Sequence, residues 1–341
     1  MRAVIARHGQ LVVDELPEPL PRPGEVLVSS RGTGVCGSDL RILAGQQQDP
    51  DHATDIVLGH EFCVEVLEYG PRTPETVPVG ALACRNPFIA TGATFEVVGV
   101  HAERPGAMAE RFLLPSTELL AVPAHVEPLR AVLTEPLAVG LHAVDSALER
   151  ASGGPYLVLG CGPIGLAVVI ALRHRGVGPI VASGHRASRR AMAATLGADI
   201  VVDPDETSPF DVWRAHGAEP LPIPPLSRTP RPPAPVIFDC TGAPGMLQQI
   251  IAGAVSGTLL SVVGAAAEPD PIVPVMATAK SLSIQFEFAY TPTDFRGALS
   301  LVASSQIDVR PLVTSVLDFE HADEMAVRTR GESEVKVVIV P

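Results

Sequence analysis

The sequence predicts an α/β fold of two domains, a β-rich domain followed by a doubly wound parallel sheet. Three observations support this prediction. Residues 1 to about 120 of the 341 read as short strands broken by Gly and Pro, residues from 156 onward alternate between strands and helices, and a glycine motif lies where that alternation begins. The chain is long enough for two separate cores, since a domain usually has roughly 100–200 residues.

The β-rich domain is predicted from short apolar runs, which lie at 2–5, 25–28, 63–67 and 111–114. Such runs, bounded by turn residues, are typical of a small barrel or sandwich. From Glu127 to about Glu149 the apolar residues instead recur every three or four positions. This spacing predicts a helix, which Pro136 is expected to break or kink.

The parallel sheet is predicted from alternating strands and helices. Strands are expected at 156–159, 180–182, 200–202, 236–239, 258–263 and 282–286, and helices at 164–175 and 188–196. This alternation produces parallel strands joined by crossover helices. A helix at 294–304 and a strand at 335–340 complete the expected elements.

One segment has a strong compositional bias. Residues 219–235 contain eight prolines. Proline lacks the backbone donor and fixes φ, so this segment cannot be a helix or an inner strand. We interpret it as a solvent loop lengthened by insertion; a lid or a subunit contact is the alternative.

Composition excludes several classes of protein. The net charge of −13 argues against a nucleic-acid partner, because a protein that binds nucleic acid needs clustered positive charges on its surface. The sequence has neither an apolar run of about 18 residues for a membrane span nor the apolar core of a signal peptide. We therefore expect a cytoplasmic protein with no membrane partner. The five cysteines are scattered along the chain, which argues against a disulfide framework. The basic residues are almost all Arg, and the only lysines are Lys280 and Lys336.

The glycine motif predicts a dinucleotide site. It follows an apolar strand and opens a helix, the context that dinucleotide binding requires. Its glycines permit a tight turn and a close approach of the backbone to the pyrophosphate, which faces the helix N-terminus. The motif reads Gly160-Cys161-Gly162-Pro163-Ile164-Gly165.

Candidate metal ligands precede this motif. Cys36, the adjacent His60 and Glu61, and Glu135 offer a thiolate, an imidazole and two carboxylates. Zinc accepts all three ligand types, and a catalytic zinc keeps one position open for water or substrate. Cys36 and His60 are the strongest candidates, with Glu61 or Glu135 as the third ligand. Either Glu61 and Glu135 both bind the zinc, one after the other, or one of them binds the zinc only through a water molecule.

These motifs carry a resemblance to a known family. The chain is similar to the zinc-dependent medium-chain alcohol and polyol dehydrogenases, of the sorbitol-dehydrogenase type, over nearly its whole length. The resemblance implies a Rossmann domain at 137–288 and a discontinuous GroES-like catalytic domain at 1–136 and 289–341, because the tail returns to the first domain in that family. Its signatures here are Gly34-Val35-Cys36-Gly37-Ser38-Asp39, Gly59-His60-Glu61 and Glu135-Pro136-Leu137.

The resemblance also assigns roles near the metal. Ser38 matches the hydroxyl that accepts the substrate proton, and Asp39 is expected to accept from the His60 imidazole and fix its tautomer. Arg41 stands where relatives often have a His, and a guanidinium cannot relay a proton. Cys84 stands alone where many relatives hold a second zinc with four cysteines, so we expect one zinc, the catalytic one.

The second strand of the Rossmann domain bears on the choice of cofactor. An enzyme that uses NAD usually presents an acidic residue at its end. Gly184 takes that position here, followed by His185 and Arg186. This pattern resembles the NADP-using members, so we predict NADP to be preferred over NAD; the alternative is an exposed basic turn that meets no phosphate. The family's adenine- and nicotinamide-side loops fall at Cys240, Thr241, Val263, Gly264 and Ala265.

We therefore expect a zinc-dependent oxidoreductase that transfers a hydride between a secondary alcohol, polyol or sugar and NAD(P). Zinc would lower the pKa of the substrate hydroxyl, Ser38 would accept its proton, and the nicotinamide would take the hydride. The alternatives are a zinc-free quinone or enoyl-type reductase of the same superfamily and a non-catalytic NADPH-binding protein. The expected partners are a small alcohol or carbonyl substrate and a second copy of the chain, in a homodimer or homotetramer; relatives dimerise through the strand near 282–286.

Overall fold

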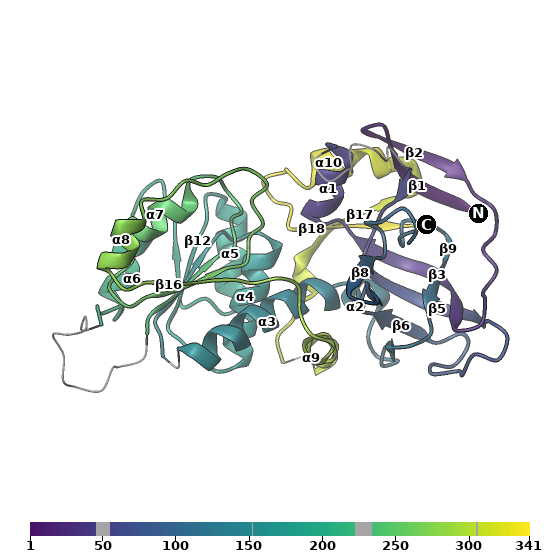
Figure 1. Ribbon diagram of the computed structural model, residues 1–341, viewed down its shortest axis with the longest axis horizontal. Coiled ribbons are helices and arrows are strands. Elements are labelled where there is room, and N and C mark those ends of the chain that lie inside the picture. The colour runs from purple at the N-terminus through teal and green to yellow at the C-terminus, as the bar shows by residue number, and fades with distance from the viewer. Residues whose placement is uncertain (46–54, 152, 222–233, 305) are drawn as a thin grey trace. The chain divides into compact units, whose positions relative to one another are not determined.

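The computed structural model describes residues 1–45, 55–151, 153–221, 234–304 and 306–341. Its contacts divide the chain into two compact units. The first contains Met1–Glu135, Phe295–Ser305 and Val309–Pro341, and the second contains Pro136–Asp294 and Gln306–Asp308. The domain boundaries expected from the sequence stay a prediction. Elements are labelled in Figure 1.

The first unit is built mainly on antiparallel strands. Its largest sheet has seven strands in the order β10-β6-β5-β3-β18-β17, with β9 also paired to β3. These strands are β3 (Glu25–Gly34), β5 (Glu61–Tyr69), β6 (Leu82–Arg85), β9 (Arg111–Pro115), β10 (Leu119–Ala121), β17 (Val313–Asp318) and β18 (Lys336–Val340). The other strands are β1 (Arg2–Arg7), β2 (Gln10–Glu15) and β4 (Ile56–Val57) in one sheet, and the hairpin β7 (Phe88–Thr91) and β8 (Thr94–Val97).

The C-terminal strand β18 pairs with β3 and thereby belongs to the first unit. The pairing is antiparallel, with Val338 opposite Gly34 and Ile339 opposite Thr33. Strands of this sheet contribute to two separate apolar clusters: one includes Ile339, and the other includes Phe112. The helices of this unit are α1 (Gly37–Leu43), α2 (Pro128–Ala131), most of α9 (Pro292–Ser304) and α10 (Met325–Arg328), with short 3-10 turns at Arg310–Leu312 and Phe319–Glu324.

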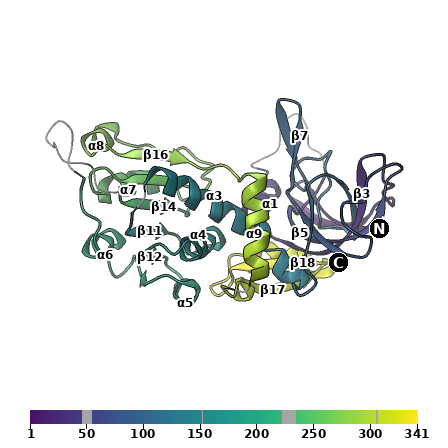
Figure 2. The same cartoon turned by 90° about the horizontal axis from the view of Figure 1, so that it is seen from below.

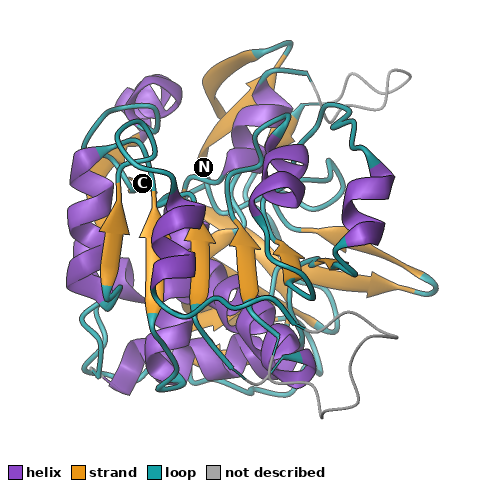
Figure 3. Ribbon diagram, turned by 90° about the vertical axis from the view of Figure 1, so that its left-hand side faces the viewer, coloured by secondary structure: helices purple, strands orange, loops and turns teal. Residues whose placement is uncertain are grey.

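The second unit is a six-stranded parallel sheet with the order β13-β12-β11-β14-β15-β16. Figure 3 shows its strands as arrows that point the same way. The strands are β11 (Tyr156–Leu159), β12 (Ile180–Ser183), β13 (Ile200–Val202), β14 (Val236–Asp239), β15 (Leu259–Val262) and β16 (Ser283–Phe286). The order reverses between β11 and β14, and this switch point is where doubly wound sheets bind their ligands.

Helices cover both faces of this sheet, as Figures 1 and 2 show. One face carries α3 (Thr134–Arg150), α4 (Pro163–His174) and α5 (Ala187–Leu196); the other carries α6 (Pro209–Ala215), α7 (Met246–Gly253) and α8 (Pro274–Ala279). Residues 165–172 of α4 are all buried. A helix that is apolar on every side must lie inside a domain, which explains the central position of α4.

The predicted α/β fold of two parts is confirmed, with one correction. Pro136 does not break the helix, because α3 begins at Thr134 and places Pro136 in its first turn. The N–H groups of a first turn have no partner within the helix, so a proline is tolerated there. The interruption instead falls at 132–133, between α2 and α3.

Two further observations concern single segments. The proline-rich segment 219–235, interpreted above as a loop, lies mostly outside the described residues. Within the described ranges, none of the helices combines the length and the apolar character needed to span a bilayer.

Candidate active site

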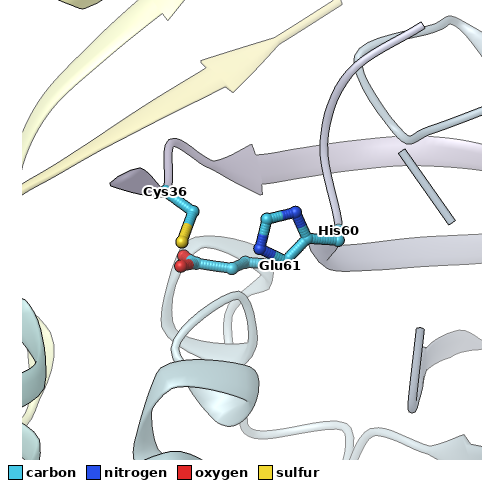
Figure 4. A group of neighbouring side chains, drawn as sticks. All are labelled: Cys36, His60 and Glu61. Atoms are coloured by element: carbon cyan, nitrogen blue, oxygen red, sulfur yellow. The ribbon is translucent and has the colours of Figure 1, made fainter. Parts of the chain in front are cut away.

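Cys36, His60 and Glu61 form one cluster in the first unit (Figure 4). The Cys36 sulfur, a His60 ring nitrogen and a Glu61 carboxylate oxygen all lie within 4.8 Å of one another. The strand pairing explains this proximity. Gly34, the last residue of β3, pairs with Glu61, the first residue of β5, so the turn that follows β3 reaches the turn that precedes β5.

The cluster is largely enclosed and contains polar atoms that lack a hydrogen bond within the described part of the chain. His60 is 7% exposed and Glu61 is 1% exposed. Buried polar atoms are normally hydrogen-bonded, yet four atoms of this neighbourhood lack a hydrogen bond from the described residues. They are Ser38 Oγ, Asp39 Oδ1, His60 Nδ1 and Glu61 Oε2.

Asp39 holds the turn that carries Cys36. Its Oδ2 accepts a hydrogen bond of 2.8 Å from the Cys36 backbone N–H. Its Oδ1 lies 3.7 Å from Nδ1 of His60. Burial raises the pKa of the Asp39 carboxyl above its usual range. Asp39 therefore lies beside the imidazole that it was expected to orient.

The electrostatic field of the cluster favours a positive charge. Burial alone lowers the pKa of His60, but Cys36 and then Asp39 outweigh it and raise that pKa well above its ordinary value. A field that stabilises an imidazolium also stabilises a metal cation. The thiolate, imidazole and carboxylate of this cluster are all zinc ligands, so these residues fit a zinc ion.

Glu135 is not a member of the three-residue group. It is the second residue of α3 and is 8% exposed. Its charge acts on both His60 and Lys336. The structure thus brings Glu61 into the cluster with Cys36 and His60, and it places Glu135 within electrostatic reach of them.

Lys336 of β18 is a neighbour of the cluster that the sequence analysis did not assign. Its Nζ donates to Glu61 Oε1 at 2.7 Å and to the Val35 carbonyl at 3.1 Å, and the residue is only 3% exposed. The signal was present in the sequence. Lys336 is one of two lysines in the chain and stands in an otherwise apolar strand.

The glycine motif of the second unit has the expected geometry. Gly160 has a φ of +94°, which side-chain-bearing residues rarely adopt. A Cβ on Gly165 would lie 1.7 Å from the Gly160 carbonyl oxygen, so this position needs glycine for close packing. Gly162 caps α4, and Pro163 and Ile164 open its first turn.

A cavity of about 440 Å³ lies at the carboxyl ends of β11, β12 and β14. Ligands of doubly wound sheets bind at this edge. Four predicted cofactor residues line the cavity, together with Asp205, which the sequence analysis did not assign. The four are Gly160, Gly184, His185 and Thr241.

The turn after β12 carries the residues predicted to select the cofactor. A Cβ on Gly184 would lie 3.1 Å from the Cys161 sulfur, so an acidic side chain there requires Cys161 to move. His185 is exposed, and its Nδ1 lies 2.9 Å from Asp205 Oδ2. Arg186 caps α5. The turn therefore presents a basic pair with one nearby carboxylate.

The loops after β14 and β15 meet at Asp239. Its side chain accepts from the Thr241 N–H at 2.9 Å and from the Thr241 hydroxyl at 2.7 Å. Its carbonyl oxygen accepts from the N–H groups of Val263 and Gly264 at 2.9 and 2.8 Å. Cys240 N–H donates to the Leu159 carbonyl at 2.9 Å, and Ala265 is exposed.

Comparison with known proteins gives consistent matches. Residues 22–124 match the alcohol dehydrogenase GroES-like domain, and residues 163–304 match the zinc-binding dehydrogenase family. Sorbitol dehydrogenase of Gallus gallus is 30% identical over 351 residues, covering 99% of this chain and 96% of the relative.

Two solved structures are similar over almost the full length of both chains. One is a protein of Sinorhizobium meliloti described as a zinc-binding dehydrogenase and bound to NADP, with a TM-score of 0.84, 27% identity and coverage of 100% and 99%. The other is 2R,3R-butanediol dehydrogenase of Bacillus subtilis, with a TM-score of 0.84, 26% identity and the same coverage.

A Rossmann sheet with its glycine motif, and a Cys-His-Glu cluster on a GroES-like unit, define the class of dinucleotide-dependent, metal-associated dehydrogenases. The chain belongs to the zinc-dependent medium-chain alcohol and polyol dehydrogenase family. The predicted family and the predicted fold class are confirmed. The protein is therefore an enzyme, an alcohol or polyol oxidoreductase, and its partner is a small-molecule alcohol.

Proposed function

We propose that the protein is a zinc-dependent dehydrogenase that oxidises the secondary hydroxyl of a polyol or diol with NADP in preference to NAD. The cluster of Cys36, His60 and Glu61, in which His60 and Glu61 are buried and Cys36 is half-buried, is the observation that carries this proposal. Elemental analysis combined with turnover of alcohols, polyols and sugars, each with NAD and with NADP, tests it. Active protein that holds no zinc, or turnover confined to quinones or enoyl thioesters, contradicts it.

One zinc ion would be held by Cys36, His60 and one carboxylate, either Glu61 or Glu135. The bound ion polarises the substrate oxygen and lowers the pKa of the hydroxyl. Nδ1 of His60 faces Asp39, which leaves Nε2 as the ring nitrogen for the metal. Asp39 would fix this tautomer, because an acceptor at one ring nitrogen keeps the proton there.

Ser38 is the proposed proton acceptor. Its hydroxyl is buried in α1, two residues after Cys36, and has no hydrogen-bond partner in the described structure. A hydroxyl in that state can receive a hydrogen bond from the substrate and accept its proton. As Ser38 accepts this proton it would release its own, and because Arg41 cannot take part in such a relay, the nicotinamide ribose is the proposed next group on the way to water.

The turn after β12 supports the preference for NADP. Gly184 places no carboxylate against the ribose, and the close contact with Cys161 disfavours one. His185, in the cavity, and Arg186, beside it, can both bond to a 2′-phosphate. The Asp205 carboxylate opposes this, because it lies 2.9 Å from His185 and carries a like charge to the phosphate. The similar Sinorhizobium meliloti protein is bound to NADP.

The names of the relatives support a substrate with several hydroxyl groups. Sorbitol and 2R,3R-butanediol both have hydroxyls on adjacent carbons, and relatives named for them are 30% and 26% identical to this chain. We therefore propose a polyol or vicinal diol as the substrate class. A simple secondary alcohol that turns over faster than every diol and polyol would contradict this choice.

A second copy of the chain is the proposed partner at the edge of the parallel sheet. β16 is an edge strand, and an exposed strand edge is a template for pairing with another chain. Phe286 is 65% exposed and Phe288 is 69% exposed. Burial of these rings in a dimer would remove apolar surface from water. Sedimentation of the protein as a monomer at micromolar concentration would contradict the proposed dimer.

A further inference from the structure

Arg190 is bonded to the turn that carries the residues predicted to select the cofactor. It lies on α5, and its Nη1 donates to the carbonyl oxygens of Gly184 at 2.7 Å and His185 at 2.6 Å. Its Nη2 lies 2.6 Å from Asp203 Oδ2, and the two side chains are 16% and 19% exposed. Three contacts thus hold one guanidinium, and two of them fix the backbone of the turn.

The loop after β13 completes this anchor. The carbonyl of Val202, the last residue of β13, accepts from the Gly184 N–H at 3.2 Å. In the loop, Asp203 Oδ1 accepts from the Asp205 N–H at 3.1 Å, and Asp205 Oδ2 lies 2.9 Å from His185 Nδ1. Both the backbone and the side chains of this loop therefore hold the turn in one conformation.

The anchor sets the direction of the polar backbone groups in the turn. In a trans peptide group, the C=O and the N–H point in opposite directions. The carbonyls of Gly184 and His185 point to Arg190, so the N–H groups of the same two trans peptides, those of His185 and Arg186, point away from it.

The cavity lies on the side of the turn that these N–H groups face. Gly184 and His185 line the cavity of about 440 Å³, whereas Arg190 is not among the described residues that line it. The carbonyl oxygens that Arg190 holds are therefore turned away from the cavity. Successive backbone N–H groups form a site that favours an anion, and carbonyl oxygens in the same place would repel one.

The contribution of Arg190 is one of geometry rather than of charge. Its guanidinium is paired with the Asp203 carboxylate, so the charge of Arg190 is already balanced within the pair. Arginine presents its donors in a rigid planar fork, and here the fork joins two carbonyls of the turn to the loop after β13.

We propose that Arg190 is a positioning residue for NADP. It holds the turn at Gly184 and His185 so that the N–H side of the turn, with the His185 and Arg186 side chains, receives the 2′-phosphate. This inference rests on the proposed preference for NADP, and it adds a residue that acts through the turn rather than by touching the cofactor.

Binding of two nucleotide fragments, measured by calorimetric titration, tests this role without turnover or zinc. Adenosine 2′,5′-bisphosphate carries the 2′-phosphate, and AMP lacks it. Arg190→Met should bind the bisphosphate about 10-fold more weakly than the wild type, the ratio expected for loss of one hydrogen bond to a charged group. It should bind AMP almost as tightly as the wild type. An equal loss with both fragments, or no loss with either, overturns the proposal.

Arg175→Met is the matched control, because it removes another ion-paired arginine of the second unit. Arg175 caps the C-terminal end of α4, away from the glycine motif, and bonds to Asp145 at 2.7 and 2.6 Å. This variant should bind both fragments as the wild type does. A loss of bisphosphate binding equal to that of Arg190→Met would reveal a general effect of charge and overturn the proposal.

A crystal structure of the wild type with adenosine 2′,5′-bisphosphate needs no destabilised variant. The proposal predicts the 2′-phosphate on the N–H side of the turn, with Arg190 still bonded to both carbonyls. An Arg190 guanidinium bonded to the phosphate would overturn it. A wild type that binds the bisphosphate no better than AMP would instead contradict the proposed preference for NADP, so the two failures are distinguishable.

Discussion

Asp39 and His60 face each other in a buried site, with 3.7 Å between Asp39 Oδ1 and His60 Nδ1. The other oxygen of Asp39 is fixed by the Cys36 backbone N–H. One carboxylate thus connects the residue that supplies the thiolate with the residue that supplies the imidazole. This arrangement resembles the carboxylate–histidine pairs that orient metal ligands in other proteins.

The first prediction concerns this pair. Asp39→Asn keeps the size of the side chain and removes its charge, so it should lower zinc affinity by about 10- to 100-fold, the usual cost of losing such a partner. Chelator competition measures the affinity. Unchanged zinc affinity would show that Asp39 only holds the turn at Cys36.

The second prediction concerns the proton. Ser38→Ala removes the buried hydroxyl and should lower turnover by about 10²–10⁴, the contribution typical of general acid–base catalysis. Zinc content should not change, because Ser38 is not a proposed ligand. Steady-state kinetics on protein of verified zinc content gives the result, and full activity of the variant would remove Ser38 from the mechanism.

The third prediction concerns the cofactor. A charge-assisted hydrogen bond from Arg186 to the 2′-phosphate contributes about 1.5–3 kcal/mol, which corresponds to a ratio of roughly 10 to 150 in kcat/KM. Arg186→Ala should therefore weaken the use of NADP and leave the use of NAD nearly unchanged. A variant in which both Arg186 and His185 are changed should lose more kcat/KM for NADP than either single variant.

Asp205→Asn provides the complementary measurement. It removes the carboxylate next to His185, so kcat/KM for NADP should rise relative to that for NAD. Equal losses with both cofactors in Arg186→Ala, or a wild-type preference for NAD, would refute the assignment.

The fourth prediction concerns stability and pH. Asp294 Oδ2 accepts from Thr291 N–H at 2.8 Å and lies 2.9 Å from His142 Nδ1. Burial alone raises the pKa of Asp294, but these groups outweigh it and hold the pKa below the ordinary value of 3.8. The stabilisation is therefore complete above the unfolded-state pKa and is lost as the pH falls through the folded-state pKa.

Asp294→Asn isolates this contribution. The variant should be less stable than the wild type by about 0.3–1 kcal/mol at about pH 5, the range for a charge near a helix N-terminus. The difference should shrink as the pH falls below the ordinary value of 3.8 and through the lower folded-state pKa, because the wild-type carboxyl then becomes protonated. Urea unfolding of both proteins measures it, and a difference that grows on acidification would contradict the assignment.

The sequence predicted the parts of the structure that depend on local patterns. The apolar run Tyr156–Leu159 and the glycine motif after it predict a strand and the start of a helix, and the structure has β11 and α4 there. The same pattern also predicted the edge of the sheet at which a cofactor would bind. Pro136 was misread because the effect of a proline depends on its distance from the helix start, and the preceding turn at 132–133 carries no Gly or Pro.

Contacts made by strand register were out of reach. Lys336 lies 275 positions from Glu61, and only the pairing of β18 with β3 brings the two together. Asp205 was missed because it follows β13, whereas the cofactor pattern was sought after β12. The proximity of Cys36 to His60 was inferred from the family motifs rather than from apolar periodicity, which contains no information on such distant pairs.

The most direct test of the account is the zinc content of active protein, measured by elemental analysis before and after chelation. We predict one zinc per chain, loss of turnover on its removal, recovery on its return, and dinucleotide binding that persists throughout. Cys36→Ala and His60→Ala should reproduce the metal-free state. Full turnover by protein without zinc would contradict the account.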